Sequence, residues 1–92
     1  MKKLIALAAL MVALPASAMT CEELSDYAAE VMAKRQDEVS MVDVMKEAKT
    51  DVQRSVVLSA YQRPSFIGDK WKSKTIKSFA NDVAASCYAL SI

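Results

Sequence analysis

The chain has 92 residues, of which 12 are lysine or arginine and 11 are aspartate or glutamate, so its formal charge at neutral pH is +1. A dedicated nucleic-acid binder is normally strongly basic, and this balance argues against that class. The chain contains no histidine, which removes the most common general base, metal ligand and near-neutral pH switch together. A domain of this size buries a modest core and usually needs a cross-link.

Residues 1–18 have the pattern of a secretory signal peptide. Lys2 and Lys3 precede an apolar run over residues 4–14, and Ala16-Ser17-Ala18 fits the small-x-small cleavage pattern. As a helix the apolar run would measure about 16 Å, against about 30 Å for a membrane core, which disfavours the alternative of a membrane anchor. We therefore expect a mature chain over residues 19–92 that is periplasmic or secreted and has no transmembrane segment.

The first predicted helix begins after Thr20, which forms a capping box with Glu23. Lys34 and Arg35 lie at its C-terminal end, where basic side chains favour the helix dipole. Apolar side chains recur along it at helical spacing, at Cys21, Leu24, Ala28, Val31 and Met32.

Residues 40–61 form either one long helix or two helices with a bend near Lys49. Ser40 is a typical N-cap, and Thr50 followed by Gln53 offers a second capping box inside the stretch. Pro64 disfavours a helical conformation at the residue before it, so this helical region should end near residue 61.

The last predicted helix follows the loop at residues 64–69, which contains the one glycine of the chain, and Asp69 is its predicted cap. The pattern contains no convincing strand. The sequence therefore predicts an all-α fold, in which residues 19–92 form a single domain, a small antiparallel bundle of three to four helices. The apolar face of the last helix comprises Ile76, Phe79, Ala80, Val83 and Cys87.

The two cysteines lie at opposite ends of the mature chain, Cys21 at the start of the first predicted helix and Cys87 near the end of the last. If these helices pack antiparallel, the two sulfurs meet, and an oxidising compartment then favours a disulfide. The alternatives are weaker. Ala18 and Thr20 do not match the residues that precede a lipidated cysteine, and no C-x-x-C or histidine supports a metal site. A reactive thiol would rely on the helix N-terminus alone to lower its pKa.

The candidate interaction surface lies around residues 64–69 and the start of the last helix. Lys70, Lys74 and Lys77 share one helix face, which suits an anionic envelope surface or an acidic partner, and equally an ordinary solvated face that pairs with the acidic first helix. Trp71 is either an exposed anchor or packs back on the loop beside Phe66. The full candidate set is Arg35, Gln36, Tyr61, Pro64, Phe66, Lys70, Trp71, Lys74 and Lys77. We predict no catalytic residue, metal site or cofactor.

The mature chain resembles a group of small exported proteins of phages, prophages and bacterial genomes. The matching positions are Cys21, Leu24, Ala28, Met32, Arg35, Gln36, Met41, Met45, Ala60, Tyr61, Pro64, Phe66, Phe79, Cys87 and Tyr88. The chain departs from the group at Glu38, where a glycine is expected in a turn. The group has no known activity, so the resemblance implies the architecture and the compartment only.

A weaker resemblance is to periplasmic acid-stress chaperones, which are also small helical proteins with one disulfide. Thr20-Cys21-Glu22-Glu23 is similar to the start of their mature fold, although the second cysteine lies further along this chain. A function taken from this resemblance alone is an analogy.

These observations lead to three functional hypotheses. The first is a non-enzymatic periplasmic protein that binds a protein partner or an anionic envelope surface, with modulation of the host envelope as its role if it is phage-derived. The second is an acid-stress chaperone, because nine of the 11 acidic residues precede Arg54 and acidification would leave a strongly cationic chain. An enzyme of unknown type is least favoured, since the sequence has no nucleophile elbow or phosphate loop.

Overall fold

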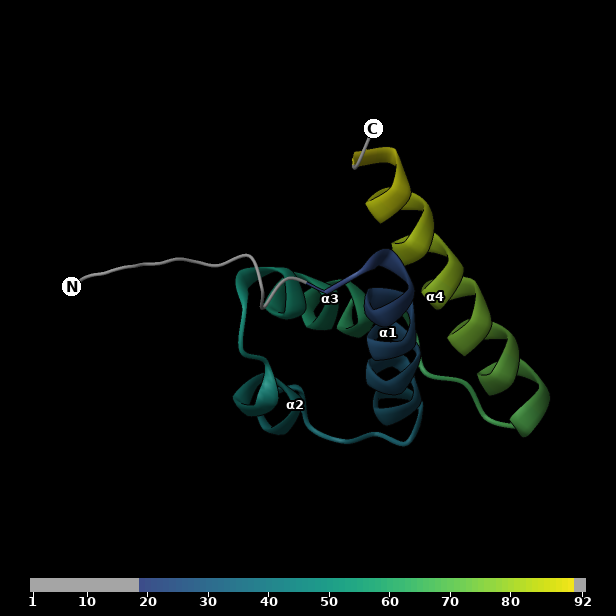
Figure 1. The fold of residues 1–92 in the computed structure, drawn as a ribbon. Helices are drawn as coiled ribbons and strands as arrows, with labels where there is room; N and C mark the ends of the chain where they lie inside the picture. The colour runs from purple at the N-terminus through teal and green to yellow at the C-terminus, as the bar shows by residue number, and fades with distance from the viewer. Residues whose placement is uncertain (1–18, 91–92) are drawn as a thin grey trace, which may run out of the picture.

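The computed structural model describes residues 19–90, and four α-helices account for most of them (Figure 1). The helices are α1 (Cys21–Gln36), α2 (Met41–Glu47), α3 (Asp51–Tyr61) and α4 (Asp69–Leu90). No strand occurs in residues 19–90, so the predicted all-α fold is confirmed. The predicted signal peptide lies outside the described residues.

The helices begin at or beside the predicted caps. The Thr20 hydroxyl accepts a hydrogen bond from the Glu23 backbone N–H at 3.0 Å, and the Thr20 N–H donates to the Glu23 carboxylate at 2.9 Å. The Ser40 hydroxyl accepts from the Val42 N–H at 3.2 Å. These bonds satisfy backbone donors that have no partner within the first turn.

The stretch over residues 40–61 is two helices, which resolves the alternative left open by the sequence. Ala48 and Thr50 have extended backbones, with ψ of 127° and 163°, and they interrupt the helix between α2 and α3. The Thr50 hydroxyl accepts from the Gln53 N–H at 3.1 Å, while the Gln53 side chain accepts from the Lys49 N–H at 2.7 Å. The second capping box therefore differs from the ordinary motif in one bond. The Gln53 side chain accepts from the N–H of Lys49, one residue before the N-cap Thr50, and not from that of Thr50 itself.

A tight turn after α1 depends on Glu38, which has a left-handed backbone with φ of 63°. The Val39 N–H donates to the Lys34 carbonyl at 2.9 Å and the Glu38 N–H donates to the Arg35 carbonyl at 3.0 Å. This pair of bonds is the Schellman motif, which favours glycine at the left-handed position. The turn therefore has the backbone conformation typical of a glycine at position 38, although this chain has a glutamate there.

The start of α4 differs slightly from the prediction. Asp69 is the first residue of the helix rather than its cap, because the Lys72 N–H donates to the carbonyl of Gly68 at 3.2 Å. Gly68 has φ of 99°, a conformation in which any other residue is strained. The chain needs this glycine to turn from the loop into α4.

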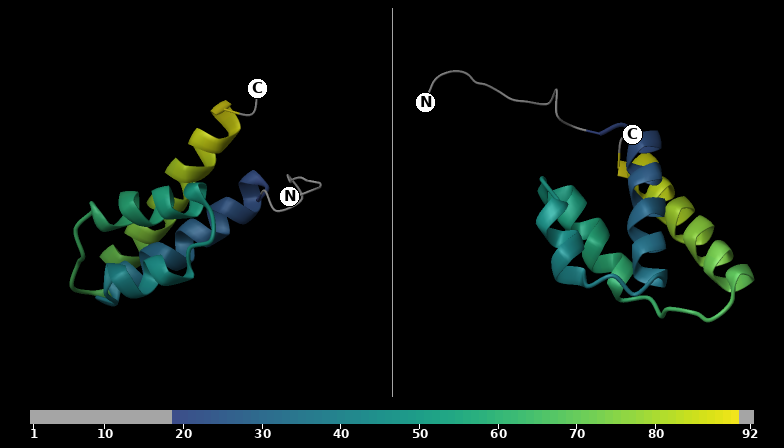
Figure 2. Two further views of the ribbon diagram at one scale, coloured as in Figure 1. Left: turned by 90° about the vertical axis from the view of Figure 1, so that its left-hand side faces the viewer. Right: turned by 90° about the horizontal axis from the view of Figure 1, so that it is seen from below.

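The helices pack around α1, which lies between α3 and α4 in Figure 1. The α1–α4 contact is the most extensive, and α3 packs on α1 beside it, while α2 packs mainly on α3 (Figure 2). The Ser25 hydroxyl of α1 also donates to the Ala80 carbonyl of α4 at 3.2 Å. The buried core comprises Leu24, Ala28, Val31, Met32, Val44, Ala48, Val56, Val57, Ala60 and Phe79.

The predicted Cys21–Cys87 disulfide is present, with 5.6 Å between the two Cα atoms. It joins the first residue of α1 to the last turns of α4, so these helices run antiparallel as expected. A disulfide is compatible with a compartment outside the cytosol. None of the helices within residues 19–90 has both the length and the apolar character that crossing a membrane requires.

Replacing both cysteines with serine should lower the free energy of unfolding by about 4 kcal/mol, because the bond closes a loop with a sequence separation of 66. Urea unfolding followed by circular dichroism measures this change. Since small domains are stabilised by only about 5–15 kcal/mol in total, the variant should be partly unfolded near 37 °C. A loss below about 1 kcal/mol would contradict this role.

Replacing Glu38 with glycine should raise the free energy of unfolding by about 1 kcal/mol, because glycine adopts the left-handed conformation without steric cost. Asp37 is the matched control. Its backbone is ordinary, with φ of −86°, so Asp37→Gly should lower stability by about 0.5–1 kcal/mol through the entropy of the unfolded chain. Changes of the same sign in both variants would contradict the assignment.

Candidate functional site

Four of the predicted surface residues form a clamp that holds the α3–α4 loop against the end of α1. We call Arg35, Gln36, Tyr61 and Pro64 the loop clamp. The Gln36 amide nitrogen donates to the Pro64 carbonyl at 3.0 Å, and its amide oxygen accepts from the Phe66 N–H at 2.8 Å. The structure brings these predicted surface residues together through contacts within the chain.

Gln36 is not a surface residue, which corrects the prediction. Its side chain is only 2% exposed, because it ends α1 beneath the loop and supplies partners for two backbone groups there. A buried polar side chain is tolerated when its hydrogen bonds are made. Gln36 is therefore structural.

Arg35 and Tyr61 complete the clamp. The Arg35 Nε donates to the Arg63 carbonyl at 3.0 Å, and its guanidinium lies 5.4 Å from the centroid of the Tyr61 ring. The Tyr61 hydroxyl donates to the Val39 carbonyl at 2.6 Å, which joins the end of α3 to the turn after α1.

Three side chains on α1 and α3 have a raised pKa. Burial raises the pKa of the Tyr61 phenol and of the Tyr27 phenol, and the hydrogen bond to Glu47 raises the pKa of Lys34. In each case folding favours the protonated form. The stability from these groups is therefore complete below about pH 10 and is lost only as the pH rises through the folded pKa values.

The rest of the predicted surface is exposed. The Phe66 and Trp71 rings have centroids 6.3 Å apart, yet Trp71 is 53% exposed and the neighbouring Ile67 is 98% exposed. We call Phe66, Ile67 and Trp71 the loop tip. Trp71 therefore packs beside Phe66 of the loop, which was one prediction for it. It is also exposed to solvent, which was the other.

The lysine face, defined as Lys70, Lys74 and Lys77, is also exposed. The ion pairs within residues 19–90 involve other residues, so these lysines do not pair with the acidic side chains of α1. The Lys74 ammonium instead lies 5.2 Å from the centroid of the Trp71 ring.

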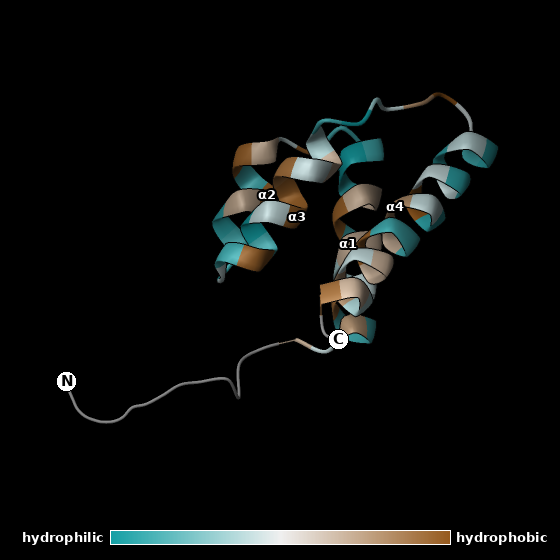
Figure 3. Cartoon of the chain, turned by 90° about the horizontal axis from the view of Figure 1, so that it is seen from above, coloured by the Kyte–Doolittle hydropathy of each residue, from teal (hydrophilic) through white to brown (hydrophobic). Residues whose placement is uncertain are grey.

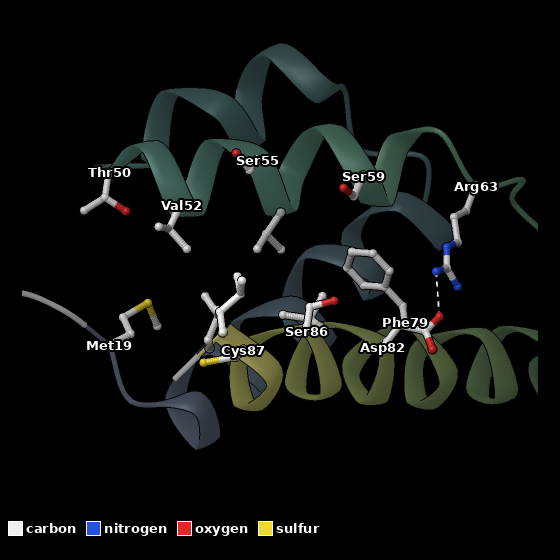
Figure 4. Close-up of a pocket in the computed structure, with 14 residues that line it drawn as sticks. Met19, Thr50, Val52, Ser55, Ser59, Arg63, Phe79, Asp82, Ser86 and Cys87 are labelled. Atoms are coloured by element: carbon white, nitrogen blue, oxygen red, sulfur yellow. Dashed lines mark hydrogen bonds and ion pairs between the residues drawn. The ribbon is translucent and has the colours of Figure 1, made fainter. Parts of the chain in front are cut away.

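A groove lies between α3 and α4, which the sequence did not predict. It has a volume of about 770 Å³, and Figure 4 shows side chains of the two helices facing each other across it. The groove exists because α3 and α4 both pack on α1 and barely contact each other. Its lining comprises Met19, Leu24, Thr50, Val52, Ser55, Val56, Ser59, Arg63, Phe79, Asp82, Val83, Ser86, Cys87 and Leu90.

One charged pair closes the groove at one end. Arg63 and Asp82 form an ion pair at 2.7 Å, and the Arg63 guanidinium lies 5.0 Å from the centroid of the Phe79 ring. At the other end lie Cys87 and Met19 (Figure 4). Between these ends the walls carry aliphatic side chains and small hydroxyl groups, so the groove is suited to apolar, uncharged material.

The described residues contain no cluster of three or more histidine, cysteine, aspartate or glutamate side chains able to hold a metal ion. Both cysteines are bonded to each other, so neither is a free thiol. The carboxylate in the groove, that of Asp82, is paired with Arg63.

Val52 illustrates why the groove was not predicted from the sequence. Its spacing continues the apolar face of residues 40–61 and predicts burial, whereas the side chain is 56% exposed in the groove wall. The serines at positions 55 and 59 recur at helical spacing on the same side of α3 and were an available signal. These positions line a groove because α3 and α4 both pack on α1 and barely contact each other.

Replacing Gln36 with leucine should lower the free energy of unfolding by about 2–4 kcal/mol, because the Pro64 carbonyl and the Phe66 N–H would lose their partner. The loop should also become sensitive to limited proteolysis. Gln62→Leu is the control, since that side chain is exposed and should change stability by less than about 0.5 kcal/mol. Equal effects of both substitutions in urea unfolding would contradict the clamp.

The chain matches no known protein family, no curated protein and no solved structure.

Proposed function

We propose that this protein is an exported, non-enzymatic binding protein that holds an amphipathic helix of a protein partner in the α3–α4 groove. The observation that carries the proposal is the groove itself. Two antiparallel helical walls stand on the common floor of α1, and the described residues place no helix between them. A helix laid there would complete a compact bundle.

The groove fits a helix better than a small molecule. A small-molecule site normally covers most of its ligand, whereas this groove is open along one side, with Val52 and the 87% exposed Leu90 facing solvent. Helix-in-groove recognition needs an open apolar trough and leaves the polar face of the ligand in water. The α3 wall from Thr50 to Arg63 is about 20 Å long, which matches between three and four helical turns.

The lining also defines the chemistry of the partner. The one charged pair in the groove, Arg63 with Asp82, is internally neutralised, so the docked face of the partner should be uncharged. Ser55, Ser59 and Ser86 are small and allow a helix to approach closely. The partner should therefore present apolar residues at i, i+3 or i+4 and i+7, with small or medium side chains toward the serines.

Two further observations support a non-enzymatic role outside the cytosol. The chain has no histidine, and both of its cysteines are used in the disulfide, so the usual general base and the thiol nucleophile are missing. The signal-like residues 1–18 and the resemblance to exported phage and prophage proteins favour the periplasm. Modulation of the host envelope is the role that fits such an origin.

The acid-stress chaperone is a weaker candidate for the same groove. That function requires acid to expose apolar surface by removing ion pairs. Among the described residues two ion pairs link separate elements, Lys34 with Glu47 and Arg63 with Asp82, and exposed pairs of this kind contribute only about 0–1 kcal/mol each. Acid has little electrostatic stabilisation to remove, which favours a groove that already binds at neutral pH.

Photo-crosslinking in living cells tests the proposal. A photoreactive amino acid at Ser59, which lines the groove, should label one discrete partner, and mass spectrometry should place the label on an amphipathic helical segment. The same group at the neighbouring Leu58, exposed but outside the lining, should not label that segment. Identical labelling at both positions, or a label on a lipid, would refute a helix-binding groove.

Val52→Asp provides the matched affinity test. A carboxylate at this half-exposed groove position should lower binding of the identified segment at least tenfold, because the docked helix would desolvate an unpaired charge. Val42→Asp, at an equally exposed apolar position on α2 outside the groove, should leave affinity unchanged. Titration calorimetry with the synthetic segment measures both.

A further inference from the structure

We propose that the loop tip and the lysine face together dock this protein onto an anionic phospholipid bilayer. The proposal concerns a different surface from the α3–α4 groove and does not depend on the groove having a partner. We infer that this surface binds the headgroup region of a membrane, because its side chains are exposed, its loop is held in place and its lysines are positively charged.

The loop tip presents apolar side chains to solvent. Ile67 is almost completely exposed, and Phe66 and Trp71 are exposed beside it. Part of the α3–α4 loop is coloured as hydrophobic in Figure 3. Scattered surface leucines are ordinary, but adjacent exposed aromatic and aliphatic side chains at the crest of one loop mark an interaction site.

The loop is held in this exposed position. The buried Gln36 side chain bonds to Pro64 and to Phe66, and Arg35 bonds to the carbonyl of Arg63. The backbone on the N-terminal side of the tip is thereby fixed to the end of α1, and Gly68 turns the chain into α4 on the other side. Fixing the tip outward reduces the entropy lost when it inserts.

The charges next to the tip are complementary to an anionic surface. Residues 64–81 contain four lysines and one acidic residue, and none of these lysines takes part in an ion pair of the described residues. Lysines in the first turns of a helix oppose its dipole, so the stability of α4 does not explain them. Attraction to anionic headgroups explains the position of these lysines.

The arrangement favours a bilayer over an acidic protein. The tip is a protruding loop rather than a pocket, and a protruding apolar side chain inserts readily into the boundary between headgroups and acyl chains. Trp71 with Lys74 against its ring has the amphipathic character of membrane-interface anchors. An acidic protein would satisfy the lysines but would leave Ile67 without an apolar partner.

Binding to this surface leaves the groove accessible. Trp71 and Cys87 are separated by about 24 Å along α4, and the groove is lined by the part of α4 from Phe79 onward. The loop tip is therefore at the opposite end of α4 from Cys87 and Leu90, which line the groove. The two proposals fail independently, because substitutions at Ile67 should not alter crosslinking from Ser59.

Vesicle partitioning tests the inference directly, because Trp71 is the one tryptophan of the chain. The oxidised protein, recovered after export, is titrated with vesicles of phosphatidylglycerol and phosphatidylethanolamine, and separately with phosphatidylcholine. We expect a blue shift of the Trp71 emission and at least tenfold stronger partitioning into the anionic vesicles. No blue shift with anionic vesicles would overturn the proposal, and so would a shift produced by soluble polyglutamate but not by vesicles, which would assign the surface to an acidic protein.

Two variants separate the apolar and the electrostatic contributions to vesicle partitioning. Ile67→Ser should weaken partitioning about fivefold without unfolding the protein, since the side chain is 98% exposed. Replacing Lys70, Lys74 and Lys77 simultaneously by glutamine should lower the partition coefficient by about fivefold for each lysine removed. Partitioning into the anionic vesicles should then fall to the level seen with phosphatidylcholine. Val42→Ser on α2 is the control and should change partitioning less than twofold. Equal partitioning of wild type and Ile67→Ser would also overturn the proposal.

Discussion

The Cys21–Cys87 disulfide joins the first residue of α1 to the last turns of α4, and it cross-links the two helices that share the most extensive contact of the fold. Because the bond and the α1–α4 packing fix these two helices, α3 does not need to pack on α4 to hold the fold together. Both α3 and α4 use α1 as their support instead. The cross-link thus permits an open apolar groove in a domain too small to leave much apolar surface uncovered.

The sequence predicts the local structure well because its signals are local. Thr20, Ser40 and Thr50 each accept a hydrogen bond from a backbone N–H two or three residues ahead, and that chemistry needs only neighbouring residues. The apolar spacing likewise predicts the burial of Leu24 and Phe79. The disulfide is predictable because both cysteines lie on apolar faces at helix ends that antiparallel packing brings together.

The site was less predictable because it depends on relations between elements. Gln36 is polar and ends a helix, which is typical of an exposed residue, and its burial follows only from the path of a loop 28–30 residues later. Val52 belongs to the apolar face of α3, yet helical periodicity does not specify whether that face meets another helix or solvent. The exposure of Ile67 and Trp71 similarly depends on the clamp that holds the loop outward.

The single helix α4 connects these features and explains why the chain tolerates two exposed apolar surfaces. Its N-terminal turns carry Trp71 of the loop tip and the lysines, its middle supplies Phe79 to the core, and its last turns carry Cys87 and one wall of the groove. Exposed apolar surface normally favours aggregation. The lysines flank the loop tip with like charges and hydroxyl groups line the groove, so each apolar surface is bordered by hydrated polar groups. An arrangement in which one end of α4 meets a membrane and the other receives a helix would place a bound partner at a fixed distance from the bilayer.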